Sequence, residues 1–245
     1  MKRKNDERTT STARAPTTTP ASQAPPPPKR TTPQPPPAPA KKAPPAIRIS
    51  DSFSNGVIDR QLWYVFATGT GEEVTERNGR LELSIRGDGV PGGDYNQISG
   101  QIGTHCHFSG DFDASVDYEL LRWPAESGVY VQLAAFFDNG VAGISRQSHG
   151  GELYAAWVPP HSSTMPTADT YGRLRVRRVG NAVTTYYRAE RRWAVLERSL
   201  IPGTANLGLQ VFSPARDFGH ADVAAAFDNF RVTGRGVVGP ACPAA

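Results

Sequence analysis

The sequence lacks several features that would place it in a common class of protein. Only two of its 245 residues are cysteine, and Cys106 and Cys242 fit either free thiols or one disulfide without deciding the compartment. No apolar run approaches the roughly 18 residues of a membrane helix, so we expect no membrane span. The charged start, Met1 to Arg8, is not followed by a hydrophobic region, so the sequence as written shows no secretory signal.

Sequence motifs of several enzyme classes are also absent. There is no Gly-x-Ser-x-Gly elbow, no Walker-type phosphate loop and no dinucleotide-binding fingerprint. The Gly-rich segment from Gly87 to Gly93 is not followed by a helical pattern, so we expect a loop there. His105 and His107 share one face of an expected strand, but no third ligand stands at a spacing that supports zinc.

Charge is distributed unevenly along the chain. Residues 1–46 contain nine Lys and Arg residues against two acidic ones, whereas the rest contains 18 basic and 21 acidic residues. The basic character therefore belongs to the N-terminal segment, and we expect no nucleic-acid binding through the folded part. Thirteen of the 22 prolines also lie in residues 1–46, which predicts a disordered Pro/Thr-rich linker.

The segment from Gly110 to Phe137 carries the strongest structural signal. Between Phe112 and Leu120 the even positions are apolar and the odd positions are polar, which is typical of a strand with one buried face. The following run, Val129 to Phe137, is apolar on both faces apart from Gln132, which indicates a strand that is covered on both sides or lines an aromatic groove. We expect these strands at the centre of a β-sandwich.

Turn signals recur every 8–12 residues along the rest of the chain, and no stretch shows useful helical periodicity. Asn78-Gly79 and Gly180-Asn181 each separate two alternating runs and predict hairpins. The fold class we expect is all-β, a two-sheet antiparallel sandwich or jelly roll. It spans residues 47–234, after the linker of residues 1–46 and before a flexible C-terminal tail of residues 235–245.

Several short runs resemble the concanavalin A-like, or laminin-G-like, jelly-roll domains. The matching runs are Asp51-Ser52-Phe53, Gly110 to Asp113, Arg173 to Val183 with Trp193 after it, and the closing run Phe227 to Val232. The resemblance covers about residues 50 to 233 and implies two antiparallel sheets, of which the concave one often grips glycans. It also implies an extracellular or cell-surface location, although it says little about activity, because one fold hosts many functions.

The same resemblance implies a structural calcium ion near the paired terminal strands. Asp51 and Asp228 would then be its side-chain ligands, joined by backbone carbonyls. The alternative is that both acids cap turns or make surface hydrogen bonds.

Four acidic residues lie on one face of the expected strand: Asp111, Asp113, Asp117 and Glu119. Glycosidases of this fold, of the laminarinase type, carry a Glu-x-Asp-x-x-Glu run, which is absent here. We therefore expect a solvated acidic face with no cleft, paired across strands with the alternating arginines Arg173, Arg175 and Arg177.

Aromatic and polar side chains are the best candidates for sugar binding, because sugars stack on aromatic rings and bond amides and charged groups. The candidate binding residues are Tyr130, Gln132, Arg146, His149, Tyr154 and Trp157. We expect Arg146 and His149 in a turn, and we expect Tyr154 and Trp157 on opposite faces of one strand. The alternative is that the aromatic residues belong to the core.

Together these patterns favour a non-catalytic recognition domain that binds a glycan or a protein surface and is displayed on a flexible spacer. One alternative is a glycosidase-like hydrolase of the same fold, acting on a polysaccharide or a modified disaccharide. Another is a structural surface or assembly protein. Two carboxylates converging in a groove would favour the hydrolase.

Overall fold

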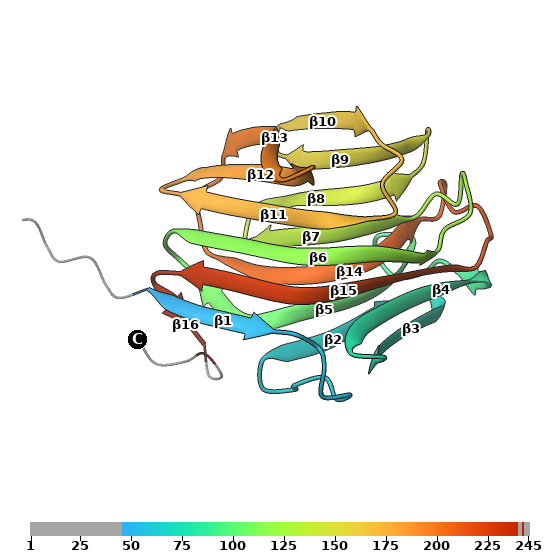
Figure 1. The fold of residues 1–245 in the computed structure, drawn as a ribbon, viewed down its shortest axis with the longest axis horizontal. Coiled ribbons are helices and arrows are strands. Elements are labelled where there is room, and N and C mark those ends of the chain that lie inside the picture. Colours follow the sequence, from blue (N-terminus) through green and yellow to red (C-terminus); the bar gives the residue numbers. More distant parts are fainter. Residues whose placement is uncertain (1–45, 240–241, 243–245) are drawn as a thin grey trace, which may run out of the picture. The chain divides into compact units, whose positions relative to one another are not determined.

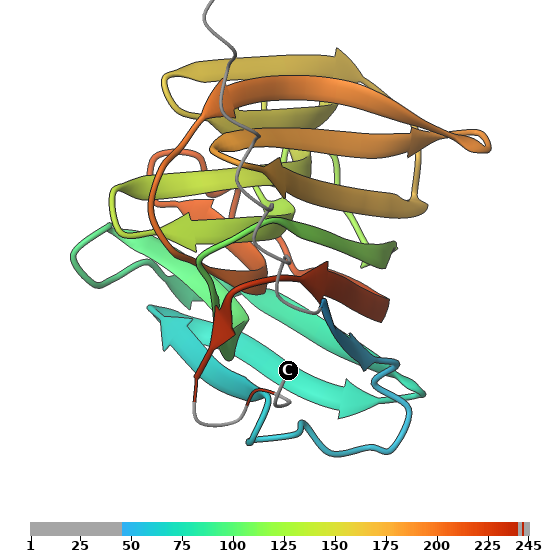
Figure 2. The same cartoon turned by 90° about the vertical axis from the view of Figure 1, so that its left-hand side faces the viewer.

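The computed structural model describes residues 46–239 and residue 242, which form two antiparallel sheets stacked face to face (Figures 1 and 2). This confirms the expected all-β sandwich of the concanavalin A-like type. Apart from Ala46, the expected N-terminal linker lies outside the described residues. Within the described part of the chain there is no helix with the length and apolarity that a membrane span requires.

The strands are divided equally between the two sheets. The first sheet has the order β13-β12-β11-β6-β15-β4-β3, with β1 paired to β15, and the second has the order β10-β9-β8-β7-β14-β5-β16, with β2 paired to β5. The bounds are β1 Ile47–Asp51, β2 Trp63–Thr68, β3 Thr70–Arg77, β4 Arg80–Val90, β5 Gln97–Phe108, β6 Phe112–Arg122, β7 Tyr130–Phe137, β8 Gly140–Ser148, β9 Glu152–Val158, β10 His161–Pro166, β11 Tyr171–Val179, β12 Ala182–Ala189, β13 Arg192–Leu200, β14 Ala205–Pro214, β15 Val223–Gly234 and β16 Val237–Val238.

Strands β6 and β7, which come from the segment with the strongest sequence signal, lie at the centres of opposite sheets. Along β6 the apolar positions Phe112, Ala114, Val116 and Tyr118 are buried, and the polar positions between them face outward. Because the turn between β6 and β7 crosses from one sheet to the other, the outer faces of the two strands are opposite surfaces of the sandwich.

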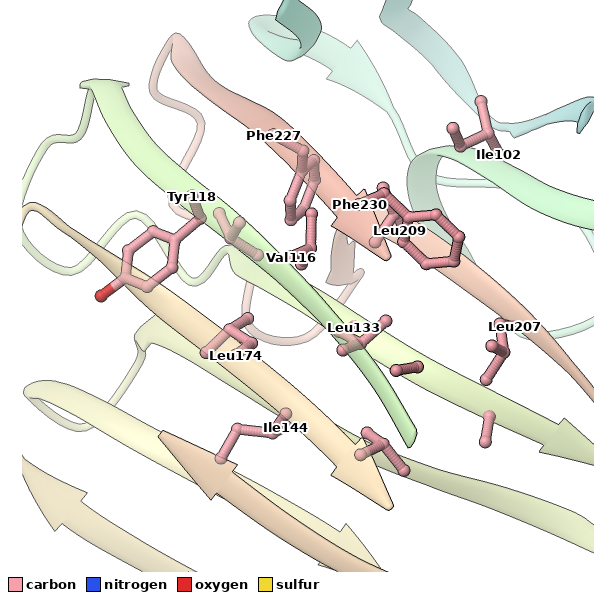
Figure 3. Close-up of a cluster of buried hydrophobic side chains, with 14 of the residues drawn as sticks. Ile102, Val116, Tyr118, Leu133, Ile144, Leu174, Leu207, Leu209, Phe227 and Phe230 are labelled. Carbon is pink, nitrogen blue, oxygen red and sulfur yellow. The ribbon is translucent and has the colours of Figure 1, made fainter. Parts of the chain in front are cut away.

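The core lies between the sheets and is apolar along almost its whole length. Figure 3 shows side chains of both layers meeting there, with Val116 and Phe227 from the first sheet and Leu133 and Leu209 from the second. Each of these four side chains is completely buried. Burial of this apolar surface is the main stabilising contribution, at about 25 cal/mol per Å².

Both predicted hairpins are present. Asn78 and Gly79 adopt φ angles of 55° and 73° and join β3 to β4, as a type I′ turn requires. Gly180, at φ 59°, begins the turn that joins β11 to β12. Local turn chemistry therefore sets the register of these two strand pairs.

One strand lies in a polar segment whose composition is typical of a loop, between His161 and Thr170. Residues His161–Pro166 form β10, which pairs with β9 at the edge of the second sheet. Its side chains are mostly exposed and polar, which is common for edge strands and explains why the composition resembles a loop.

A β-bulge in β15 changes which of its side chains face outward. Phe227 and Phe230 both point into the core, although they are three positions apart. The register shifts between Asp228 and Arg231, and Asn229 has a φ of 52°. The extra residue places both Asp228 and Arg231 opposite the outward side chains of β6, which a regular strand cannot do.

Part of the predicted C-terminal tail is tied to the sandwich. Strand β16, Val237–Val238, pairs with β5 opposite Phe108 and His107. Cys242 forms a disulfide with the buried Cys106, with a Cα–Cα distance of 5.5 Å. The C-terminal segment therefore departs from the expected flexible tail at these residues, and the two cysteines pair.

Candidate active site

The predicted sugar-contact residues are divided between two environments. Tyr130 and Gln132 of β7 face outward on the second sheet, and so does Trp157 of β9, whose side chain is 49% exposed. Gln132 is only 8% exposed and accepts a hydrogen bond from Gln210 on β14. Gln101 lies across from Gln210, so glutamines of three neighbouring strands form a row, which we call the glutamine face.

Arg146 and Tyr154 do not reach the glutamine face, because both point between the sheets. Arg146 lies within β8 and not in a turn, and it is 2% exposed. Its guanidinium forms an ion pair with Glu152, donates to the carbonyl oxygens of Gln147 (2.7 Å) and Asp169 (2.9 Å), and lies over Trp123. The expectation that it sits in a turn is wrong, because β8 continues through Arg146 to Ser148.

A small polar cluster lies at one end of the glutamine face. Tyr130 stacks on Phe212 and donates to Asp217 at 3.4 Å, and His149 Nε2 lies 3.7 Å from the same carboxylate. Burial and the Asp217 charge raise the pKa of Tyr130 to about 12, so the phenol is neutral near pH 7. Tyr130 is therefore held in place by its neighbours on two sides.

Within the described part of the chain, the two central strands of the glutamine face supply no pair of carboxylates of the kind that glycoside hydrolysis requires. The outward side chains of β8 are Val141, Gly143, Ser145 and Gln147, and those of β7 include no acid among the described residues. Amides and rings can contact sugar hydroxyls and C–H faces, but they cannot act as an acid and base pair. A role in sugar contact for Tyr130, Gln132, His149 and Trp157 stays a prediction.

The residues predicted to bind calcium are engaged elsewhere. Asp51 accepts hydrogen bonds from the backbone N–H of Phe53 and from the indole N–H of Trp63, both at 2.8 Å, which matches the capping alternative. Asp228 accepts from the backbone N–H of Asn229. Among the described residues, no group of three or more His, Cys, Asp or Glu side chains is placed to hold a metal ion. A structural calcium ion held by Asp51 and Asp228 with backbone carbonyls stays a prediction.

The outer face of the first sheet holds a cleft of about 1010 Å³, which corrects the expectation of an acidic face without a cleft. Five carboxylates line it: Asp117, Glu119, Asp169, Glu190 and Asp228. The cationic residues in its wall are Arg80, Arg173 and Arg188. We call this hollow the acidic cleft.

Asp117, on the floor of the acidic cleft, is held by a cation as the sequence predicted. Arg173 donates two hydrogen bonds to it, and Asn229 of the β15 bulge donates a third at 3.2 Å. Farther along the same strands, Arg175 binds Asp113 in the same two-bond manner. These carboxylates are engaged in bidentate ion pairs, whereas Asp228 forms no ion pair with another described residue and Glu119 pairs with Arg80 through one hydrogen bond.

Glu119 is connected to the β3–β4 hairpin through Arg80. The guanidinium of Arg80 donates to Glu119 at 2.7 Å and to Glu82 at 3.0 Å. Burial acts to raise the pKa of Glu82, but hydrogen bonds from Asn78, Arg77 and Arg80 outweigh it and lower the pKa to about 2. Glu82 is therefore a fixed anion that anchors Arg80 beside the cleft.

The β15 bulge brings Asp228 close to Glu119. Asp228 lies directly opposite Asp117, and Ala226 lies opposite Glu119, so Asp228 and Glu119 are diagonal neighbours on paired strands. Diagonal neighbours have Cα atoms about 7–8 Å apart. Side chains from these positions can reach the separation of about 6.5–9.5 Å between carboxyl groups that inverting glycosidases use.

Two buried tyrosines lie below the cleft and hold Asp169, one of its lining residues, in place. The hydroxyl groups of Tyr118 and Tyr154 are 2.7 Å apart, and Tyr154 also donates to Asp169 at 2.8 Å. Burial raises the pKa of Tyr118 to about 12, and burial together with Tyr118 and Asp169 also raises the pKa of Tyr154. Tyr154, predicted as a sugar contact, is thus a buried support for Asp169.

Known proteins resemble this chain in fold and not in sequence. No family model and no curated protein matches the sequence. Solved structures that match include an endo-β-galactosidase from Clostridium perfringens that releases GlcNAcα1-4Gal (14% identity, 82% of this chain and 66% of that chain, TM-score 0.56). Others are the β-glucanase of Bacillus licheniformis (13%, 77% and 99%, 0.55) and a Mycobacterium tuberculosis protein described as an immunostimulatory antigen and pseudo β-1,3-glucanase (12%, 76% and 98%, 0.53).

These neighbours establish the concanavalin A-like jelly roll. Because they include an endo-β-galactosidase and a β-glucanase, they favour the hydrolase alternative and contradict the expectation of a non-catalytic recognition module. The neighbours do not bear on the laminin-G part of the resemblance, which stays a prediction. Since one neighbour is a pseudo-glucanase, the activity of this chain has to be argued from its own carboxylates.

Proposed function

We propose that this protein is a glycosidase-like hydrolase that cleaves a glycan in the acidic cleft. The observation that carries the proposal is the diagonal pair Glu119 and Asp228, which opens into a hollow of about 1010 Å³. Glycoside hydrolysis needs one carboxylic acid to protonate the leaving oxygen and one carboxylate to activate water or attack the sugar. The fold of the neighbours supports a glycan as the substrate.

The surroundings of the two carboxyl groups suggest different roles. Glu119 receives a hydrogen bond from Arg80, which suits a carboxylate that acts as the base on a water molecule. Asp228 forms no ion pair within the described part of the chain and faces Asp117 directly, which suits the proton donor. Glu119 would accept a proton from a water molecule as the oxygen of that water attacks the anomeric carbon. Asp228 would protonate the departing oxygen in the same step, which gives inversion.

The test is release of reducing ends from a panel of neutral and acidic polysaccharides. We expect the natural chain to cleave at least one, and Glu119→Gln and Asp228→Asn each to lower kcat by about 100-fold or more. Asp94→Asn, an exposed acid in the loop after β4, is the matched control and should retain full activity. Cleavage that survives both cleft substitutions would overturn the site, and failure to cleave any panel member would overturn the function.

We also propose that the protein works in an oxidising compartment, outside the cell or at its surface. The support is the disulfide between Cys106 and Cys242, since such bonds persist in oxidising environments. Alkylation of unreduced protein recovered from its natural source should leave both cysteines unmodified. Quantitative alkylation of both would contradict the proposal.

A further inference from the structure

A second hollow lies beside the acidic cleft on the outer face of the first sheet. Its volume is about 510 Å³, and its charged lining residues are Asp111, Asp113, Arg177, Arg178, Arg231 and Arg235. Four arginines against two aspartates give this lining a positive balance, although the described domain is acidic overall. We call this the arginine hollow.

The four arginines differ in how far their charge is already satisfied. Arg178 is buried and donates to the carbonyl oxygens of Gly180 (2.7 Å) and Gly203 (2.6 Å), so it is part of the framework. Arg177 is weakly paired, because the Asp113 oxygen nearest to it is 3.9 Å away and is already bound by Arg175. Exposed Arg231 and Arg235 form no side-chain ion pair with another described residue. Two to three guanidinium groups thus remain available to a ligand.

The arginine hollow continues directly from the acidic cleft along β6 and β15. On β6 the outward side chains run from Glu119 and Asp117 in the cleft to Ser115 and Asp113 in the hollow. On β15 the bulge sets Asp228 in the cleft and Arg231 in the hollow. Outward positions two residues apart on a strand are about 6.6–6.8 Å apart, so an extended ligand lying along β6 can touch both regions.

An anionic group is the ligand that this chemistry selects. Guanidinium groups bind carboxylate and sulfate oxygens through two parallel hydrogen bonds. They bind such a ligand most tightly when no protein carboxylate competes for the same guanidinium. We propose that the arginine hollow binds a carboxylate or sulfate group of an anionic glycan whose neighbouring sugars occupy the acidic cleft. The inference rests on the proposed function, because it names the substrate class of the same surface.

The test measures binding by the full-length Glu119→Gln chain to dextran sulfate, polygalacturonate and unmodified dextran at about 0.15 M salt. Using this substitution separates binding from cleavage. We expect binding to at least one acidic polymer and none to unmodified dextran, and the two acidic polymers distinguish sulfate from carboxylate recognition. Equal binding to unmodified dextran, or no binding to either acidic polymer, would overturn the inference.

A charge-matched pair of variants locates the binding site, since the basic N-terminal segment can also attract polyanions. Arg231→Ala with Arg235→Ala should weaken binding by about tenfold or more. Arg60→Ala with Arg216→Ala removes the same charge from exposed positions elsewhere and should change affinity by less than about threefold. Equal weakening by both pairs would show that overall charge carries the binding and would overturn the hollow as its site.

Two further measurements guard the interpretation. Arg231→Lys with Arg235→Lys keeps the charge but loses the bidentate geometry, so we expect it to recover only part of the affinity.

A double-stranded DNA fragment should bind no better to the natural chain than to the Arg231→Ala, Arg235→Ala variant. If DNA loses as much affinity as the acidic glycans do, the hollow is a general polyanion site and the proposed glycan specificity is wrong. If binding follows the prediction but no glycan is cleaved, the hydrolase proposal fails and the anionic-glycan site stands.

Discussion

Acid titration of Glu82 should destabilise the protein in a defined pH range. The carboxylate is 7% exposed and accepts hydrogen bonds from Arg77 (2.6 Å), Asn78 (3.0 Å) and Arg80 (3.0 Å), which lower its pKa from 4.5 to about 2. That difference corresponds to about 3 kcal/mol at most. Because Arg77 is half exposed, solvent screening reduces the expected contribution to about 1–2 kcal/mol.

The sign follows from the direction of the pKa change. Because the pKa of Glu82 is lower in the folded state, its stabilisation is present above about pH 4.5 and is lost as the pH falls through about 2. The measurement is the free energy of unfolding by denaturant, taken for the natural chain and for Glu82→Gln between pH 7 and pH 2. The difference between the two free energies reports Glu82, because the contributions of the other titrating groups cancel. Exposed Glu73→Gln is the control and should stay within about 0.5 kcal/mol. A difference between the natural chain and Glu82→Gln that is equally large at pH 7 and pH 2 would refute the reasoning.

Two further predictions concern covalent and backbone constraints. Reduction of the Cys106–Cys242 bond, which spans 136 positions, should lower the unfolding free energy by up to about 5 kcal/mol through regained chain entropy, and an unchanged denaturation midpoint would contradict this. Gly128→Ala should cost about 3 kcal/mol or more, because φ is +69° and a Cβ would lie 1.6 Å from the carbonyl oxygen of Asp217. Gly150→Ala has a similar φ of +65° but open space around it, so it should cost only about 1 kcal/mol, and equal losses in the two variants would exclude the steric cause.

The fold could be predicted because its signals are local. The alternation along β6 reports one buried face, and Asn78-Gly79 can supply the positive φ angles of a tight hairpin without strain. The outward placement of Trp157 and the inward placement of Tyr154 likewise follow from the period of a strand. Each of these signals depends on residues within a few positions of one another.

The acidic cleft could not be predicted because its residues meet only in three dimensions. Asp228 is a diagonal neighbour of Glu119 on a strand that contains one extra residue at Asn229, and the pattern of apolar residues did not reveal this bulge. Arg80 begins β4, directly after the β3–β4 turn, and Asp169 lies in the β10–β11 loop. The resemblance implied that Asp228 binds calcium with Asp51, because the run Phe227 to Val232 contains no local sign that Asp228 lies beside Glu119.

The most direct test of the central claim is the stereochemistry of the first product, observed by proton NMR of the newly formed anomeric centre during cleavage of a polysaccharide. Hydrolysis by Glu119 and Asp228 through an intervening water predicts an inverted anomeric configuration, with product formed about 100-fold more slowly, or slower still, by Glu119→Gln. Retention of configuration, or product formation by Glu119→Gln at the natural rate, would contradict the assignment of the acidic cleft as the active site.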